Sequence, residues 1–310
     1  MVEKSIVYGG IKNLGNKTIN ISKNIIKNQN HLSLEDFCSL MNIPLFDKGK
    51  MNEEQIQSVI DIISREEGFC PSSLDVIYAD ISGNQAESEF YKRCLDRTKD
   101  AKSKKNLEQK IEKLSSDGYP SLFGIAEMIF WDEKDSKDSP LKGALPGHGL
   151  LIQTRLMFDR IPHYLSPLHI RRVKQEYLDW DKDYSESDDR ILRENYIRSK
   201  RKKDYFDNTD NPYFLFGDNL IKNDYPSHEC TLVHELGHMV EENYKRIKGI
   251  DENLKTIYDS LGVSEYSCES DTEHFAECWA AYRMMPEILD EKTIKAFDSV
   301  VDIIRIKRGL

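Results

Sequence analysis

The feature that most restricts the fold of this chain is the spacing of two histidines within one predicted helix. His234 and His238 stand four residues apart in the segment HELGH, and apolar residues flank this segment on both sides. Residues at i and i+4 lie one above the other on the same face of an α-helix. Pro226 stands directly before residues 227–248, and Gly249 stands directly after them. We therefore predict a helix over residues 227–248 that is buried along one side and directs both imidazoles toward one point.

Two imidazoles in this arrangement predict a metal site. Histidines one turn apart can both bind a zinc ion, at about 2.0–2.1 Å. Zinc lowers the pKa of a bound water to near 7, and a neighbouring carboxylate such as Glu235 can then take its proton for attack on a carbonyl. The pattern thus predicts His234 and His238 as metal ligands and Glu235 as the general base. In the alternative interpretation, the segment is an ordinary amphipathic helix with two histidines. Gly237 either lets the helix approach a neighbour closely or leaves room near the metal.

A catalytic zinc needs a third protein ligand and an open position. The extended pattern HExxHxxGxxH fails here, because Glu241 and Tyr244 occupy the places of its glycine and its third histidine. The third ligand must come from elsewhere, and Glu273 is the first candidate. However, Ser270-x-x-Glu273 is also a capping-box pattern, in which the glutamate bonds back to the backbone. The local pattern leaves both interpretations open, and the replacement candidates are Glu269, Asp271 and Glu277.

A longer segment carries a family resemblance. Residues 266–279, YSCESDTEHFAECW, resemble the third-ligand segment of the anthrax lethal factor type of zinc peptidase. In that family a tyrosine stands seven residues before the ligand glutamate, and here Tyr266 and Glu273 are in register. The resemblance covers residues 210–310, is weak over 75–210 and is absent over 1–70. It implies a gluzincin-type site with one Zn²⁺ per chain, held by His234, His238 and Glu273.

The same resemblance implies roles for other residues. Glu235 would return its proton to the leaving amine, and the Tyr266 hydroxyl would stabilise the oxyanion or help to protonate the leaving group. Glu277 would orient a ligand histidine. For Tyr266 the alternative is a packing role, and for Glu277 it is a solvated charge. The family also has a short strand before the first histidine, at the edge of the catalytic sheet, where an extended peptide could bind by strand addition. The matching residues are Tyr213, Phe214, Leu215, Phe216 and Gly217.

The predicted organisation is an α+β, zincin-like catalytic domain with a small helical N-terminal region. Residues 1–32 form a flexible polar leader, which is acid-free from Lys4 onward and is either an export signal or a frayed terminus. Residues 33–72 form the helical region, and residues 73–310 form the catalytic domain. Strands are expected over 125–131 and 150–157, and a strand or short helix over 74–81. Further helices are expected over 92–114, 168–206, 271–285 and 290–307.

Charge and composition exclude several classes of function. The chain carries 44 Lys and Arg against 54 Asp and Glu, a net charge of −10, which argues against nucleic-acid binding through a basic surface. Its one basic run, RSKRKK at 198–203, could meet an acidic partner, but a solvated helix face is the preferred interpretation. There is no apolar run of about 18 residues, so no membrane span is expected. Six dispersed cysteines indicate reduced thiols.

These observations predict a monomeric zinc metalloendopeptidase that acts on a protein or peptide substrate. The resemblance suggests a secreted bacterial toxin or effector that cleaves a host protein. An apolar signal-peptide core is absent from the N-terminus, so export would be independent of a Sec signal, with action in the host cytoplasm as one destination. One alternative is a housekeeping or self-processing metallopeptidase in the bacterial cytoplasm. Another is a non-catalytic binding module that keeps the fold.

Overall fold

A computed structural model of the chain divides into two compact units, Met1–Asp159 with Arg308–Leu310, and Arg160–Lys307. Each unit is described separately. The predicted leader lies, except for its last residue, outside the described residues. The described residues are 32–47, 49–72, 74–81, 83–98, 101–116, 126–129, 148–152, 157–158, 165–178, 189–210, 212–221 and 226–310.

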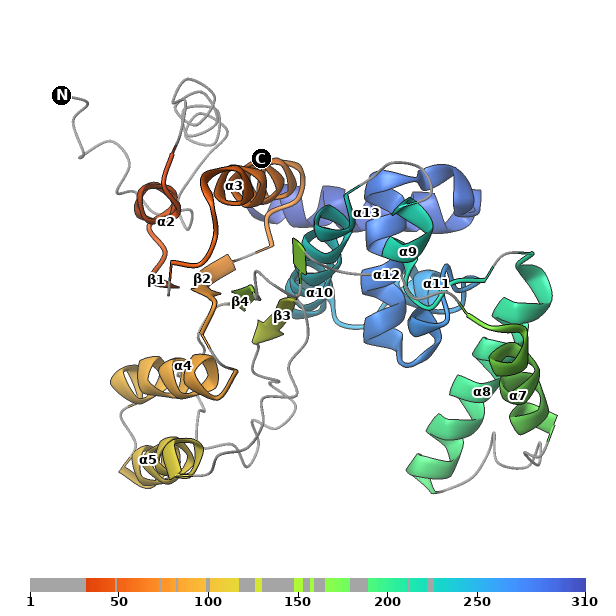
Figure 1. Cartoon of the computed structure of the whole chain (residues 1–310), viewed down its shortest axis with the longest axis horizontal. Coiled ribbons are helices and arrows are strands. Elements are labelled where there is room, and N and C mark those ends of the chain that lie inside the picture. The colour runs from red at the N-terminus through yellow and green to blue at the C-terminus, as the bar shows by residue number, and fades with distance from the viewer. Residues whose placement is uncertain are drawn as a thin grey trace. The chain divides into compact units, whose positions relative to one another are not determined.

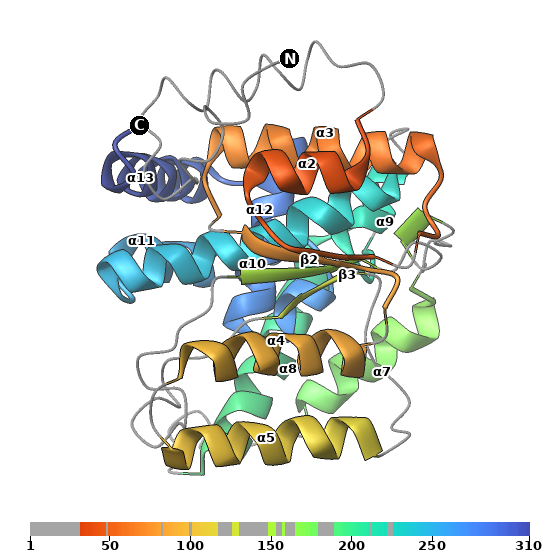
Figure 2. The same cartoon turned by 90° about the vertical axis from the view of Figure 1, so that its left-hand side faces the viewer.

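The first unit is a small mixed sheet with helices on both faces (Figures 1 and 2). Its strands, in sheet order, are β1 (Leu45–Asp47), β2 (Leu74–Ala79), β4 (His148–Ile152) and β3 (Ala126–Ile129). The first three are parallel, and β3 pairs with β4 in antiparallel orientation. On one face lie α2 (Leu34–Met41) and α3 (Glu53–Phe69), and on the other lie α4 (Gly83–Arg97) and α5 (Ala101–Ser116).

The core of this unit follows from the alternation along β2. Val76 and Tyr78 pack with Leu151 and with residues of α4 and α5. Ile77 and Ala79 point to the opposite face and are also fully buried. Parallel strands that are buried on both faces read as continuous apolar runs, so the strand alternative predicted for residues 74–81 is the one that forms.

The second unit is helical, and its described residues contain no strand of a sheet. Two of its helices, α12 (Asp271–Met284) and α13 (Glu291–Lys307), pack through aromatic side chains, because Phe275 and Trp279 lie against Phe297 with ring centroids 5.2 and 5.8 Å apart. Its elements are α7 (Pro167–Leu178), α8 (Arg190–Asn208), α9 (Phe216–Ile221), α10 (Ser227–Lys248), α11 (Glu252–Tyr258), η5 (Tyr266–Cys268), α12 (Asp271–Met284), η6 (Pro286–Ile288) and α13 (Glu291–Lys307).

The chain is mostly helical with a small sheet, so the broad α+β class is as predicted. The domain boundaries differ from the prediction. Strand β1 lies inside the region 33–72 and pairs with β2, with Phe46 opposite Tyr78, so that region belongs to the sheet unit. The predicted domain 73–310 is instead divided between residues 159 and 160. None of the described helices combines the length and apolar character needed to cross a membrane.

Candidate metal centre

Helix α10 presents the two histidines on one face, as their spacing predicts. Both residues are 7% exposed. Helix α12 lies against α10 at Gly237, where an added Cβ would stand 2.9 Å from Trp279 Cδ1. Of the two roles considered for this glycine, close approach of a neighbouring helix is the one that the packing supports. This contact places Glu273, in the first turn of α12, against the histidines.

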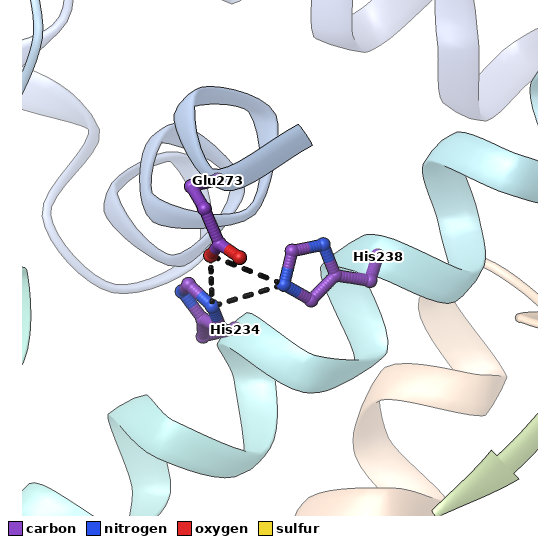
Figure 3. Close-up of side chains that lie close together, drawn as sticks. All are labelled: His234, His238 and Glu273. Atoms are coloured by element: carbon purple, nitrogen blue, oxygen red, sulfur yellow. Dashed lines mark hydrogen bonds and ion pairs between the residues drawn. The ribbon is translucent and has the colours of Figure 1, made fainter. Parts of the chain in front are cut away.

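Three side chains converge at this point (Figure 3). Glu273 Oε2 lies 3.2 Å from His234 Nε2 and 3.4 Å from His238 Nε2. The two Nε2 atoms are 3.1 Å apart. The three potential ligand atoms therefore form a nearly equilateral triangle, with two atoms from α10 and one from α12. This group could hold one metal ion.

The triangle has the dimensions of a metal coordination site. In a tetrahedral zinc site with bonds of 2.0–2.1 Å, two ligand atoms lie about 3.3–3.4 Å apart. The observed separations are close to this value. Glu273 Oε2 is buried and makes no well-aligned hydrogen bond among the described residues. Two imidazoles and one carboxylate are also the ligand set of a catalytic zinc with an open position.

The electrostatics of the group favour a positive charge at its centre. Burial lowers the pKa of His234, but the carboxylates of Glu273 and Glu277 outweigh it and hold that pKa well above its usual range. Burial alone would raise the pKa of Glu273, yet the two imidazoles hold it well below its usual range. A bound cation would supply the positive charge that these shifts indicate.

Glu277 connects His234 to the surrounding backbone. Its Oε1 lies 2.9 Å from His234 Nδ1, on the side of the ring opposite the candidate metal position. Its Oε2 accepts hydrogen bonds from the Phe216 amide at 2.6 Å and from the Ser264 hydroxyl at 2.5 Å. A carboxylate that holds the second nitrogen of a ligand histidine fixes the ring orientation and tautomer.

Tyr266, in η5, lies beside the same group. Its ring centroid is 6.2 Å from that of His234 and 5.9 Å from that of Phe214. Burial, followed by the charges of Glu273 and Glu235, raises the pKa of the Tyr266 phenol well above its usual value. The hydroxyl therefore remains protonated at neutral pH and can donate a hydrogen bond. Glu235 follows His234 on α10 and is 8% exposed.

Of the capping-box interpretation of Glu273, only the serine half forms, because its carboxylate contacts the histidines and does not bond back to the backbone. Ser270 caps α12, because its hydroxyl accepts a hydrogen bond from the Glu273 amide at 3.1 Å. The cap uses the backbone of Glu273, while its carboxylate faces the histidines. Two of the replacement candidates are directed elsewhere. Glu269 pairs with Arg198 and Lys202, and Asp271 pairs with Arg201.

The edge strand expected over residues 213–217 is wrong. Phe216 and Gly217 begin helix α9, and the Leu215 amide donates to Asp218 at 3.2 Å in the turn before it. The carbonyls of Tyr213 and Phe214 accept hydrogen bonds from the amides of Glu265 and Tyr266. A substrate strand would need these backbone groups, so strand addition along the segment is not supported. Instead, the segment forms backbone hydrogen bonds with the Tyr266 loop and donates the Phe216 amide to the Glu277 carboxylate. The sequence signal for this turn is Asp218, because an aspartate side chain can accept a hydrogen bond from a nearby backbone amide.

Comparison of the chain with protein-family models, with curated proteins and with solved structures gives no match. The fold and site alone define its class. It is an α+β protein in which one buried His-His-Glu group, within the described residues, could hold a metal ion.

The close contact at Gly237 leads to a stability prediction. We expect Gly237→Ala to lower the free energy of unfolding by about 1–3 kcal/mol, because Trp279 Cβ and Cγ would have to move away from the new methyl group. Urea denaturation measures the change. Lys248→Ala, at an exposed position of the same helix, is the control and should change stability by less than about 0.5 kcal/mol. Equal stability of Gly237→Ala and the wild type would contradict the close packing of α10 and α12.

Proposed function

We propose that this chain is a zinc-dependent metalloendopeptidase that cleaves peptide bonds in a protein substrate. The observation that carries the proposal is the convergence of His234, His238 and Glu273 at separations that suit tetrahedral coordination. Two further residues support a catalytic role for the site. Glu235 stands next to a ligand, and the protonated Tyr266 hydroxyl stands beside the group.

Each residue has a chemical task in this proposal. When bound, zinc supplies a Lewis acid for the scissile carbonyl and lowers the pKa of a water molecule. Glu235 accepts the proton of the attacking water and later donates it to the leaving amine. Tyr266 donates a hydrogen bond to the carbonyl oxygen as negative charge develops there. Glu277 keeps the His234 ring in the orientation that directs Nε2 toward the other ligands.

The finer parts of the proposal rest on the family resemblance. A zincin-like catalytic domain of the anthrax lethal factor type is supported by three sequence features. They are the HELGH helix, the spacing from Tyr266 to Glu273, and the residues that follow on α12. The same resemblance, together with the acid-free leader, supports the hypothesis of a secreted bacterial effector that acts on a host protein.

The test combines metal analysis with mapping of cleavage sites. We expect the purified full chain to contain one zinc ion, which a chelator removes and added Zn²⁺ restores. New protein N-termini would be mapped in eukaryotic and bacterial lysates treated with the zinc-loaded chain or with the chelated chain. A small set of new N-termini that depends on zinc supports the proposal. A chain that binds zinc but creates no new N-terminus would be a binding module, and a chain that binds no zinc would overturn the mechanism.

A further inference from the structure

The basic run of α8 spans residues 198–203, and its basic side chains range from 17% exposed at Lys202 to 53% exposed at Lys200. Each of its basic side chains pairs with a carboxylate of the same chain. Lys200 and Lys203 pair with acids one turn further along α8. The other three cross to residues 265–271. These pairs are Arg198 with Glu269, Arg201 with Asp271, and Lys202 with both Glu265 and Glu269.

The acids reached by α8 flank Tyr266. Glu265 stands directly before it, and Glu269 stands three residues after it. The Lys202 ammonium contacts both carboxylates, at 3.3 Å for Glu265 Oε1 and at shorter range for Glu269 Oε1. His169 of α7 adds a contact of 2.8 Å to Glu265 Oε2. One lysine therefore joins the two acids on either side of η5.

This pairing is partly buried, so it is expected to contribute more than a surface ion pair. The Glu265 side chain is 2% exposed and that of Lys202 is 17% exposed. Removal of one partner from a buried ion pair is destabilising, and without Lys202, of the described basic side chains, only His169 would remain beside Glu265 and only Arg198 beside Glu269. Without the lysine, the carboxylates of Glu265 and Glu269 would also repel each other. Cys268 of η5 adds an apolar contact, because it packs with Val173, Tyr205 and Phe206 of α7 and α8.

Backbone hydrogen bonds also hold the η5 turn. The Glu265 and Tyr266 amides donate to the carbonyls of Tyr213 and Phe214, each at 2.9 Å. The turn therefore contacts both helix α8 and the 213–214 segment. A shift of Glu265 or Glu269 away from α8 would also move the Tyr266 ring relative to His234.

We propose that Lys202 is a positioning residue for Tyr266. By pairing with both glutamates around η5, it holds the turn in the conformation in which the Tyr266 ring lies beside His234. Helices α7 and α8 then belong to the structure that aligns the site. The catalytic part of this inference rests on the proposed function, whereas the part that concerns the turn can be tested without activity.

The first experiment measures amide hydrogen exchange in the full chain. Lys202→Met keeps most of the aliphatic length of the side chain and removes its charge. We expect the Glu265 and Tyr266 amides to exchange at least about tenfold faster in this variant, because the turn opens more often. Lys200→Met is the matched control, since Lys200 pairs with Asp204 on its own helix, and it should leave these amides unchanged. Equal exchange in Lys202→Met and the wild type would overturn the proposal.

The second experiment measures cleavage of a peptide that spans a mapped site. We expect Lys202→Met to lower kcat by about 10–100-fold, with KM and zinc affinity unchanged, because only the oxyanion donor is displaced. Lys202→Arg should restore kcat. In a Tyr266→Phe background, Lys202→Met should have little further effect, because Lys202 acts through the hydroxyl that is already absent.

The outcomes separate this inference from the proposed function. If the wild type cleaves its peptide and Lys202→Met cleaves it at the same rate, the positioning role is wrong and the peptidase proposal stands. The same conclusion follows if the effects of Lys202→Met and Tyr266→Phe multiply fully. If the zinc-loaded wild type cleaves nothing, the proposed function is wrong, and the catalytic role of Lys202 is then wrong too. The exchange experiment then still decides whether Lys202 holds the turn.

Discussion

Replacement of Glu235 by alanine is expected to lower kcat/KM by about 10²–10⁴-fold, the usual contribution of a general base. The chain should still bind one zinc ion, because Glu235 is outside the group of three converging ligand atoms. The physical reason is that the attacking water loses its proton acceptor while the ligands stay in place. Initial rates on a mapped peptide and the metal content of the same sample measure the two effects together.

A second acid on α10 provides the control for this experiment. Glu242 pairs with Arg246 one turn along the helix, so Glu242→Ala removes a carboxylate from α10 without touching the candidate ligands. It should retain wild-type cleavage. Loss of zinc together with activity in Glu235→Ala would show that Glu235 supports the metal site itself. Unchanged activity in Glu235→Ala would exclude it as the base.

The sequence predicts the histidine half of the site well, because the relevant geometry is local. A four-residue spacing on a helix places His234 and His238 together whatever surrounds them. The end of that helix is also local, since Gly249 adopts φ 73° after its last residue. Likewise, the first described helix begins after Ser33, whose hydroxyl accepts a hydrogen bond from the Asp36 amide. Such signals depend on neighbours within a few residues.

The glutamate half of the site depends on packing, so residue patterns alone do not determine it. Local sequence offers Glu273 both as the glutamate of a capping box and as a ligand, and in the structure its carboxylate contacts the histidines while only its amide bonds Ser270. Its arrival beside His234 requires the close contact of Gly237 with Trp279, 42 residues later in the chain. Only the family resemblance indicated, before the structure, that Glu273 joins the two histidines.

Other features escaped prediction for similar reasons. Strand β1 has three residues, too few to show an alternating pattern. Residues 213–217 are apolar enough for a strand, but Asp218 accepts a hydrogen bond from the Leu215 amide, and helix α9 begins at Phe216. The sequence shows that the run at 198–203 is basic, but it does not show which acids pair with it. Lys202 pairs with Glu265 and Glu269, which stand more than sixty residues later in the chain.

Glu273→Ala is expected to weaken zinc binding more than any replacement of a neighbouring acid. Loss of a residue that only orients a ligand typically costs 10–100-fold in metal affinity, so loss of a ligand itself should cost more than about 100-fold. The remaining two imidazoles would also lose the carboxylate that balances the charge of the ion. Competition with a zinc-binding dye of known affinity gives the dissociation constant for each variant.

A graded series of variants distinguishes Glu273 from the other acids of its segment. Glu277→Ala removes the contact to His234 Nδ1 and should cost about 10–100-fold in zinc affinity. Asp271→Ala removes a pair with Arg201 and should leave the affinity unchanged. The expected order of losses thus follows the contacts of each carboxylate, since Glu273 contacts both histidines, Glu277 contacts one and Asp271 pairs with Arg201. A larger loss in Glu277→Ala than in Glu273→Ala would reverse their roles, because it would make Glu277 the third ligand and Glu273 a capping residue.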